Sequence, residues 1–155
     1  MSASAESLYL EKQLCFPLYA ASRLTTKIYA PLLKELDITY PQYLVLLVLW
    51  QHGEQSVNEV GNRLFLESNT VTPLLKRLEQ KELISRNRSA EDERSVRIAL
   101  TSKGELLKTE AMEIPEKIIG SFEDNSIDKA EILQFQKTLF KLVEILGNQS
   151  KTGNG

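Results

Sequence analysis

Apolar residues recur at three- and four-residue steps in two long stretches, one near each end of the chain. In residues 8–36 these positions are Leu14, Leu18, Ala21, Thr25, Ile28, Leu32 and Leu36, and in residues 126–146 they are Ile127, Ile132, Phe135, Leu139, Leu142 and Val143. The period predicts one amphipathic helix at each end. Pro17 lies in the first stretch, so that helix is expected to begin near Leu14 or to bend there.

Shorter helices are predicted between these two, and capping signals mark the start of two of them. Thr39-Tyr40-Pro41-Gln42 predicts a helix start, and the apolar run that follows reaches Trp50 before Gly53 ends it. Ser56-Val57-Asn58-Glu59 is a capping box that opens a short helix to about Leu64. A further helix is expected over residues 68–81, with an inner face made of Val71, Leu74, Leu75 and Leu78.

The pattern then changes to one typical of strands. Residues 83–87 and 95–100 have strand character, and residues 88–94 form a charged hairpin tip between them. Thr101 or Ser102 caps the next helix, which Pro115 bends or ends. We therefore expect a mainly α protein with a small β-hairpin wing (α+β). Two short helices followed by a hairpin are the order of a winged helix-turn-helix, here over about residues 39–104.

Charge and composition narrow the class of protein. The chain has 155 residues, a net charge of −2 and one cysteine, which suits a single domain in a reducing cytoplasm. Its apolar runs are too short to span a bilayer, so no membrane association is expected. Residues 63–97 hold eight basic and six acidic side chains, so positive charge gathers in the middle of the chain. The last residues, 148–155, are polar and rich in glycine, and we expect them to be disordered.

A winged helix-turn-helix places the start of its second helix near base edges in the major groove. Small polar side chains in that first turn suit phosphate and base contacts, and an arginine on the wing suits the minor groove. The candidate DNA-binding residues are Ser68, Asn69, Thr70, Thr72, Lys76, Arg77, Arg86, Asp92 and Arg94. Asp92 could pair with Arg94 and hold its guanidinium in place. The alternative is that Thr70 and Thr72 only cap a helix and that the tip is a solvated loop.

Catalytic and metal sites are not indicated by the sequence. His52 is the one histidine, no zinc-binding spacing occurs, and no glycine-rich phosphate loop is present. We therefore expect neither an enzyme nor a bound cofactor or metal. The single cysteine, Cys15, lies among apolar residues. It is either an inert core residue or a thiol that reacts with an outside molecule.

Three groups of residues carry a resemblance to a known family. Thr72-Pro73-Leu74-Leu75-Lys76-Arg77-Leu78-Glu79, then Asp92-Glu93-Arg94, then Leu100-Thr101-Ser102-Lys103-Gly104 resemble the core of the MarR family of transcription regulators. Gln13-Leu14-Cys15-Phe16, together with Tyr29 and Thr39 to Val45, resembles its organic hydroperoxide regulators, the OhrR group. Asn69 stands where such proteins often have glycine, and Glu67 where aspartate is common, so operator preference is expected to differ in detail.

The resemblance implies a homodimeric repressor bound to a palindromic operator in double-stranded DNA. Helices over about residues 8–36 and 105–147 would form the dimer interface. An organic hydroperoxide would oxidise Cys15 and release the DNA. Tyr29 and Tyr40 match the two tyrosines that hydrogen-bond this cysteine in the family. Tyr19 is a further candidate, because it lies one turn beyond Cys15 on the same helix face.

Helix geometry restricts how these residues can meet. Cys15 and Tyr29 are 14 residues apart, which is about 21 Å along a straight helix at ~1.5 Å per residue. They share a face but cannot touch, so a contact requires the partner chain in an antiparallel arrangement. Without a second cysteine, oxidised Cys15 must form a mixed disulfide with a low-molecular-weight thiol, cyclise, or over-oxidise.

Three other functions stay open at this point. The chain could be a MarR-type regulator of a small aromatic or apolar ligand, with Cys15 incidental. It could be a thiol peroxidase, although a chain without a resolving group would turn over slowly. It could also be a dimeric interaction module that does not bind DNA.

Overall fold

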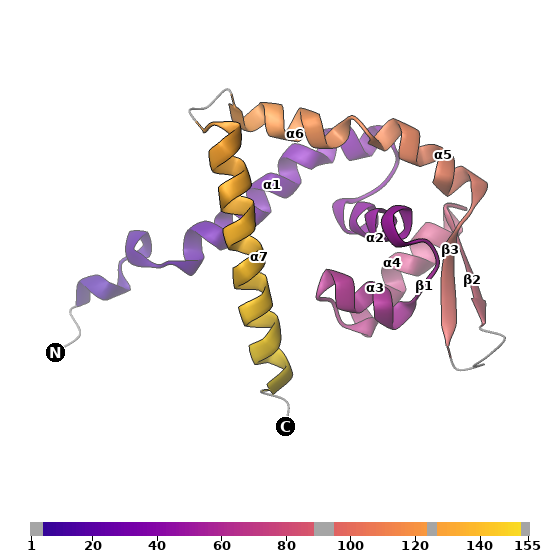
Figure 1. Ribbon diagram of the computed structural model, residues 1–155, viewed down its shortest axis with the longest axis horizontal. Helices are drawn as coiled ribbons and strands as arrows, with labels where there is room; N and C mark the ends of the chain where they lie inside the picture. The colour runs from indigo at the N-terminus through magenta and orange to yellow at the C-terminus, as the bar shows by residue number, and fades with distance from the viewer. Residues whose placement is uncertain (1–4, 89–94, 124–126, 153–155) are drawn as a thin grey trace.

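The structure, a computed structural model, describes residues 5–88, 95–123 and 127–152. The protein is mainly helical with a small antiparallel sheet, as the sequence predicts (Figure 1). Its helices are α1 (Cys15–Glu35), α2 (Tyr40–His52), α3 (Val57–Leu64), α4 (Ser68–Gln80), α5 (Ser102–Ala111), α6 (Ile114–Glu123) and α7 (Lys129–Thr152). Two 3-10 turns, η1 (Ala5–Leu8) and η2 (Leu10–Lys12), precede α1. No helix of the described residues is long and apolar enough to cross a membrane.

The sheet has the strand order β1-β3-β2 and is antiparallel throughout. Its strands are β1 (Gln55–Ser56), β2 (Ile84–Arg88) and β3 (Val96–Leu100). Ile84 lies opposite Leu100 at the root of the hairpin, and Gln55 lies opposite Ile98. The sequence predicted β2 and β3 but missed β1, because two residues are too few to show an alternating pattern.

Local signals set most of the helix boundaries. The first helix begins at Cys15, so Pro17 lies in its first turn, where a missing N–H costs nothing. The backbone N–H of Thr39 donates to Gln42 Oε1 at 3.0 Å, and the N–H of Glu59 donates to Ser56 Oγ at 3.2 Å, as the two predicted capping boxes require. Gly53, with φ 69°, ends α2 in a backbone conformation that glycine adopts easily.

The C-terminal third differs from the prediction in two places. The helix that begins after Thr101 ends at Ala111, and α6 begins at Ile114 with Pro115 in its first turn. The expected disordered tail is wrong for residues 148–152, which continue α7. No proline interrupts this stretch, so the long helix can continue into polar sequence; residues 153–155 lie outside the described part of the chain.

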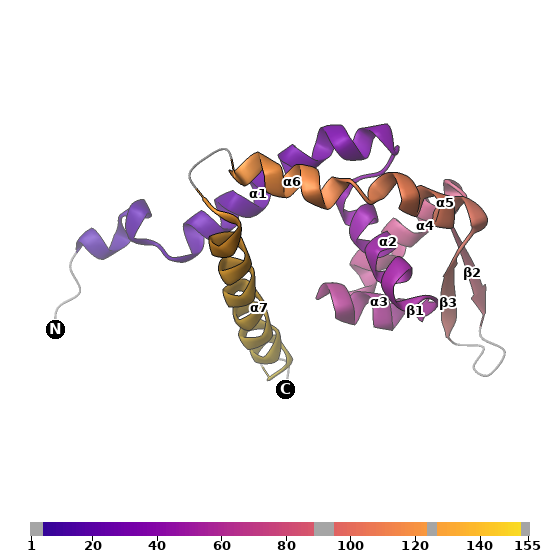
Figure 2. The same ribbon diagram turned by 45° about the horizontal axis from the view of Figure 1, so that its top comes forward.

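A continuous core joins α2, α3, α4 and the sheet, which we call the winged module (residues 40–100). Its fully buried side chains include Val45, Leu46, Leu49, Val60, Val71, Leu75, Leu78, Ile84 and Ile98. In Figures 1 and 2, α5 and α6 lead away from this module beside α1, and α7 then turns back as a separate rod. Leu33 near the end of α1 joins this core, but large apolar side chains on the rest of α1 and on α7 stay exposed, so these faces are not covered by the described residues of one chain.

Candidate functional site

The fourth helix presents the predicted DNA-contacting residues on its outer side. Val71, Leu75 and Leu78 are buried against the module core, which fixes the rotation of α4 about its axis. Five of the candidates, Ser68, Asn69, Thr70, Lys76 and Arg77, are therefore exposed. The exposed first turn combines uncompensated backbone N–H groups with small polar side chains, and both suit phosphate oxygens.

Two side-chain hydrogen bonds shape the start of α4. The Ser68 hydroxyl donates to Asn58 Oδ1 of α3 at 3.1 Å, which ties the two helices together across the turn. The Thr72 hydroxyl donates to the Ser68 carbonyl oxygen at 2.7 Å. Thr72 is half-buried, so its hydroxyl serves the helix itself more than the surface. Glu67 is the N-cap residue but makes no side-chain cap hydrogen bond.

The structure places Arg86 differently from a freely projecting DNA contact. Its Nε donates to Glu79 Oε2 at 2.7 Å, and its terminal nitrogen lies 2.6 Å from the same oxygen. The pair links β2 to α4, the predicted recognition helix of the winged helix-turn-helix. Arg86 therefore holds the wing against this helix. Asp92 and Arg94 lie outside the described residues.

Sequence reasoning missed a second arginine on the wing, Arg97 of the central strand, which lies opposite Asn87 and Ser56. Arg97 of β3 donates to Glu54 at 2.9 Å and to Glu59 of α3 at 3.1 Å. Hydrogen bonds from Ser56, and then the charge of Arg97, lower the pKa of Glu59 below its ordinary value. The signal was present: Val96, Arg97 and Ile98 alternate, so Arg97 had to face away from the core.

The predicted sensor thiol lies at the other end of the molecule, in apolar surroundings. Cys15 is the first residue of α1 and is exposed, so in one chain it is not a core residue. Leu14, Phe16 and Leu18 beside it are also exposed. Tyr19 lies one turn further on, exposed, with the Arg23 guanidinium 5.5 Å from its ring centroid.

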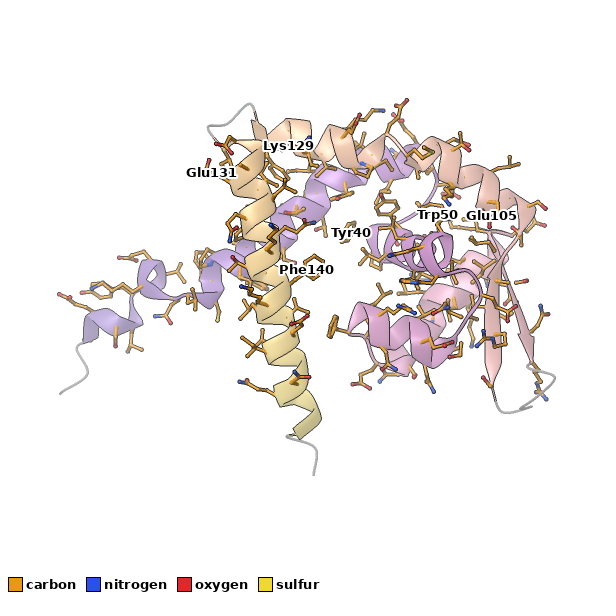
Figure 3. The ribbon with its side chains drawn as sticks, viewed as in Figure 1. Tyr40, Trp50, Glu105, Lys129, Glu131 and Phe140 are labelled. Atoms are coloured by element: carbon orange, nitrogen blue, oxygen red, sulfur yellow. The ribbon has the colours of Figure 1, made fainter. Side chains whose placement is uncertain are left out.

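Tyr29 of α1 and Tyr40 of α2 form a half-buried pair with ring centroids 4.7 Å apart. Tyr43 lies 6.0 Å from Tyr29, and Trp50 lies 6.3 Å from Tyr43, so the rings continue along α2. Figure 3 labels Tyr40, the first residue of α2, and Trp50, which lies near the end of that helix. The row extends further than the two tyrosines that the sequence singled out. Tyr43 was named there only as part of the stretch Thr39 to Val45.

These phenols are neutral at pH 7 by their ordinary chemistry, and burial raises the pKa of each further. Burial, followed by the neighbouring Tyr40 and Tyr43, raises the pKa of Tyr29 from its ordinary value near 10 to about 12. Burial also raises the pKa of Tyr40 and of Tyr43. At neutral pH all three are therefore O–H donors, the form that can stabilise an anion such as a thiolate.

Within one chain the structure does not bring the thiol and the tyrosines together. Cys15 begins α1, and Tyr29 lies 14 residues along the same unbroken helix, a separation of about 21 Å at ~1.5 Å per residue. Any Cys15–Tyr29 contact therefore belongs to an assembly of two chains.

Comparison with known proteins identifies the family. Residues 27–111 match the family described as transcriptional regulator SarA/Rot. The organic hydroperoxide resistance transcriptional regulator of Bacillus subtilis is 50% identical over 94% of this chain and 97% of its own length. Reduced AbfR bound to DNA has a TM-score of 0.69 and 38% identity, covering 91% of this chain and 97% of AbfR. AbfR is also known in an overoxidized form bound to DNA, with a TM-score of 0.68, 40% identity and coverage of 88% and 97%.

These matches agree with the arrangement of α2–α4 and the wing. MarR of E. coli, at 20% identity, shares the fold with a TM-score of 0.68 over 84% of this chain and 96% of MarR. The chain therefore belongs to the SarA/Rot family of transcriptional regulators and, among the MarR-type winged-helix proteins that bind DNA, to the organic hydroperoxide resistance regulators.

Proposed function

We propose that this protein is a homodimeric repressor whose Cys15 is oxidised by organic hydroperoxides, and that oxidation releases its operator DNA. The observation that carries the proposal is an incomplete site: an exposed thiol begins α1, and a pair of neutral, half-buried tyrosines lies at the opposite end of the same helix. A second copy completes the site.

Exposed apolar side chains support the dimer. On α1 these are Phe16, Leu18, Tyr19, Leu24 and Ile28, and on α7 they are Leu133, Phe135, Phe140, Ile145 and Leu146. So many exposed large apolar side chains on two helices are uncommon on a monomer and favour an interface between copies. If the two α1 helices pack antiparallel, Cys15 of each chain meets Tyr29 of the partner subunit.

The oxidation step follows from the groups present. The thiolate sulfur attacks the terminal hydroxyl oxygen of the peroxide, the O–O bond breaks, and an alkoxide leaves that takes up from water the proton the thiol had released, so the products are a sulfenic acid and ROH. Neutral Tyr29 and Tyr40 would donate to the thiolate and then to the departing alkoxide, and Tyr19 would cover the site. With one cysteine in the chain, an external low-molecular-weight thiol can condense with the sulfenic acid, releasing water and leaving a mixed disulfide.

On DNA, α4 of each subunit would enter the major groove of one half-site of a palindromic operator. Ser68, Asn69 and Thr70 would meet phosphates and base edges, and Lys76 and Arg77 would reach the backbone. The wing residues Asp92 and Arg94 are assigned to the minor groove by resemblance. Arg86 and Thr72 would act by holding the wing and the first turn in place.

The deciding experiment measures affinity for the DNA directly upstream of the protein's own gene, with and without tert-butyl hydroperoxide. We expect oxidation to weaken binding at least tenfold in the wild type and not at all in Cys15→Ser. Tyr29→Phe should slow the response without changing the affinity of the reduced protein. Tyr9→Phe, which removes a hydroxyl from an exposed ring in the N-terminal turns, is the matched control. A full peroxide response in Cys15→Ser would overturn the proposal.

A ligand-responsive regulator is the second candidate, because a cavity of about 430 Å³ borders Tyr40 and includes Thr26, Lys34 and Lys81. Its volume suits a small organic molecule. Under this function Cys15→Ser would behave as the wild type, and a small aromatic acid would release the DNA from both proteins.

A further inference from the structure

The turn between α3 and α4 contains a phenylalanine in a strained backbone conformation. Phe65 has φ 55° and ψ 38° in the left-handed region, where helix ends usually carry glycine or asparagine. Its ring is 61% exposed, so burial in the module core does not explain the choice. A bulky side chain at a position that favours a small one indicates that the ring itself is needed.

The ring of Phe65 rests on a glycine of α7. A Cβ built on Gly147 would lie 3.0 Å from Cε1 of Phe65 and 3.2 Å from Cδ1, closer than side-chain carbons normally approach. Only a residue without a side chain allows this contact at its present distance. The contact joins the turn that precedes the recognition helix to the helix that carries much of the exposed apolar face.

A hollow lies between α7 and the winged module beside this contact. A cavity of about 620 Å³ lies beside the contact and is lined by Asn58, Asn62 and Glu67 on one side and by Val143 and Leu146 on the other. The seventh helix packs only sparsely on the other described elements of its own chain. Figures 1 and 2 both show its C-terminal half standing apart from α3. The ring of Phe65 therefore bridges the cavity between the α3–α4 turn and α7.

The turn itself is rigid on its inner side. The N–H of Leu66 donates to the Gly61 carbonyl at 2.9 Å, and a Cβ on Gly61 would lie 2.7 Å from the Leu66 oxygen. The Ser68–Asn58 hydrogen bond fastens α4 to α3. These contacts fix α4 against α3, so the position of Phe65 is expected to set the position of α4 as well.

We propose that Phe65 is a positioning residue for DNA binding, which sets the angle of the recognition helix by resting on Gly147 of α7. Two recognition helices must reach successive major-groove faces about 34 Å apart, so the angle of each module relative to the dimer helices sets their spacing. This role concerns the reduced, DNA-bound protein and stands whether or not Cys15 senses peroxide.

The test uses Phe65→Asn, because asparagine keeps the left-handed conformation and removes the ring. Affinity is measured for the upstream DNA and for a random-sequence duplex, beside the free energy of unfolding. We expect Phe65→Asn to be at least as stable as the wild type and to bind the upstream DNA about five- to tenfold more weakly. Affinity for the random duplex should not change, and Phe65→Tyr should restore full binding.

Gly147→Ala probes the other side of the contact, with Gly120→Ala as its matched control. An added Cβ at Gly120 of α6 meets nothing within 4 Å, and both changes raise helix propensity alike. Gly147→Ala should weaken binding to the upstream DNA, Gly120→Ala should not, and Gly147→Ala should cost nothing further in Phe65→Asn. Equal effects of the two alanines, additive effects of the pair, or a loss of binding in step with stability would overturn the proposal.

Discussion

The winged module and the two terminal helices use apolar residues in opposite ways. Leu46 and Leu75 of the module are no more than 1% exposed, whereas Phe135 and Phe140 of α7 are about 60% exposed. Both regions are helical and similarly apolar in sequence. The module completes its core within one chain, while α1 and α7 present faces that remain without cover from the described residues of their own chain.

This difference separates the two activities proposed for the protein, DNA binding and thiol sensing. The candidate DNA contacts stand on the completed module, where packing fixes the rotation of α4. The candidate thiol stands on the uncompleted region, at the exposed start of α1. A chemical change at Cys15 would then act on the geometry between subunits, where little energy is needed to move the parts, and leave each module intact.

The largest effect is expected from a change in the module core. Leu46→Ala should lower the free energy of unfolding by about 3 kcal/mol, because it removes a fully buried side chain and leaves a cavity. Denaturant unfolding at one protein concentration measures it. Leu106→Ala, where the side chain is 70% exposed on α5, is the matched control and should change stability by less than about 0.5 kcal/mol. A large loss in Leu106→Ala would show that the module extends into a dimer contact.

The sequence predicted those features that depend on residues close together in the chain, and it missed those that depend on distant residues. The capping boxes at Thr39 and Ser56 act over three residues, so the sequence predicted the helix starts correctly. The two-residue β1 and the Glu79–Arg86 pair depend on contacts across a turn or a sheet. No local pattern indicates them.

The candidate site shows the same limit. Resemblance selected Cys15, Tyr29 and Tyr40, and helix arithmetic predicts that any contact between the thiol and Tyr29 joins two chains. Phe65 was missed because its significance lies in a contact with Gly147, 82 positions away. The positive φ of Phe65 is a property of the folded backbone, so neither the composition nor the periodicity of the sequence indicates it.

A charged residue introduced on α7 tests whether the exposed apolar faces of α1 and α7 pack against a second copy. Phe140 projects from α7 on the side of the winged module (Figure 3). Phe140→Asp should dissociate the proposed dimer, because each buried phenylalanine contributes about 2 kcal/mol and a twofold axis would place two of them in the interface. Sedimentation at several concentrations measures the change, and Phe140→Leu should stay dimeric. A variant that remains fully dimeric would place the interface elsewhere.

A smaller effect is expected at the cap that joins α3 to the wing. Ser56→Ala removes the oxygen that accepts from the Glu59 N–H and should cost about 1 kcal/mol of stability. Ser102→Ala is the matched control, because Thr101 caps α5 in its place. Thermal unfolding of the two variants distinguishes them. Equal melting temperatures would mean that Arg97 holds Glu59 without help from the cap.

The effect confined to alkaline pH, and the one that reports on the junction of the two regions, is the titration of Tyr29. The folded protein raises the pKa of this phenol to about 12, whereas an unfolded tyrosine titrates near 10. Unfolding therefore releases a proton in this range. The contribution of Tyr29 to stability is complete below pH 10 and is lost as pH rises through about 12.

Tyr29→Phe should flatten the fall in unfolding free energy between pH 10 and 12, and Tyr9→Phe, at an exposed position, should leave it unchanged. Tyrosinate absorbance measured in the same range should show one late-titrating group fewer in Tyr29→Phe. The shift should also depend on protein concentration. A partner subunit that covers Tyr29 adds burial, so a dimer would titrate later than the monomeric Phe140→Asp variant. Identical titrations of monomer and dimer would mean that Tyr29 belongs to the completed module alone, and that the partner's thiol does not reach it.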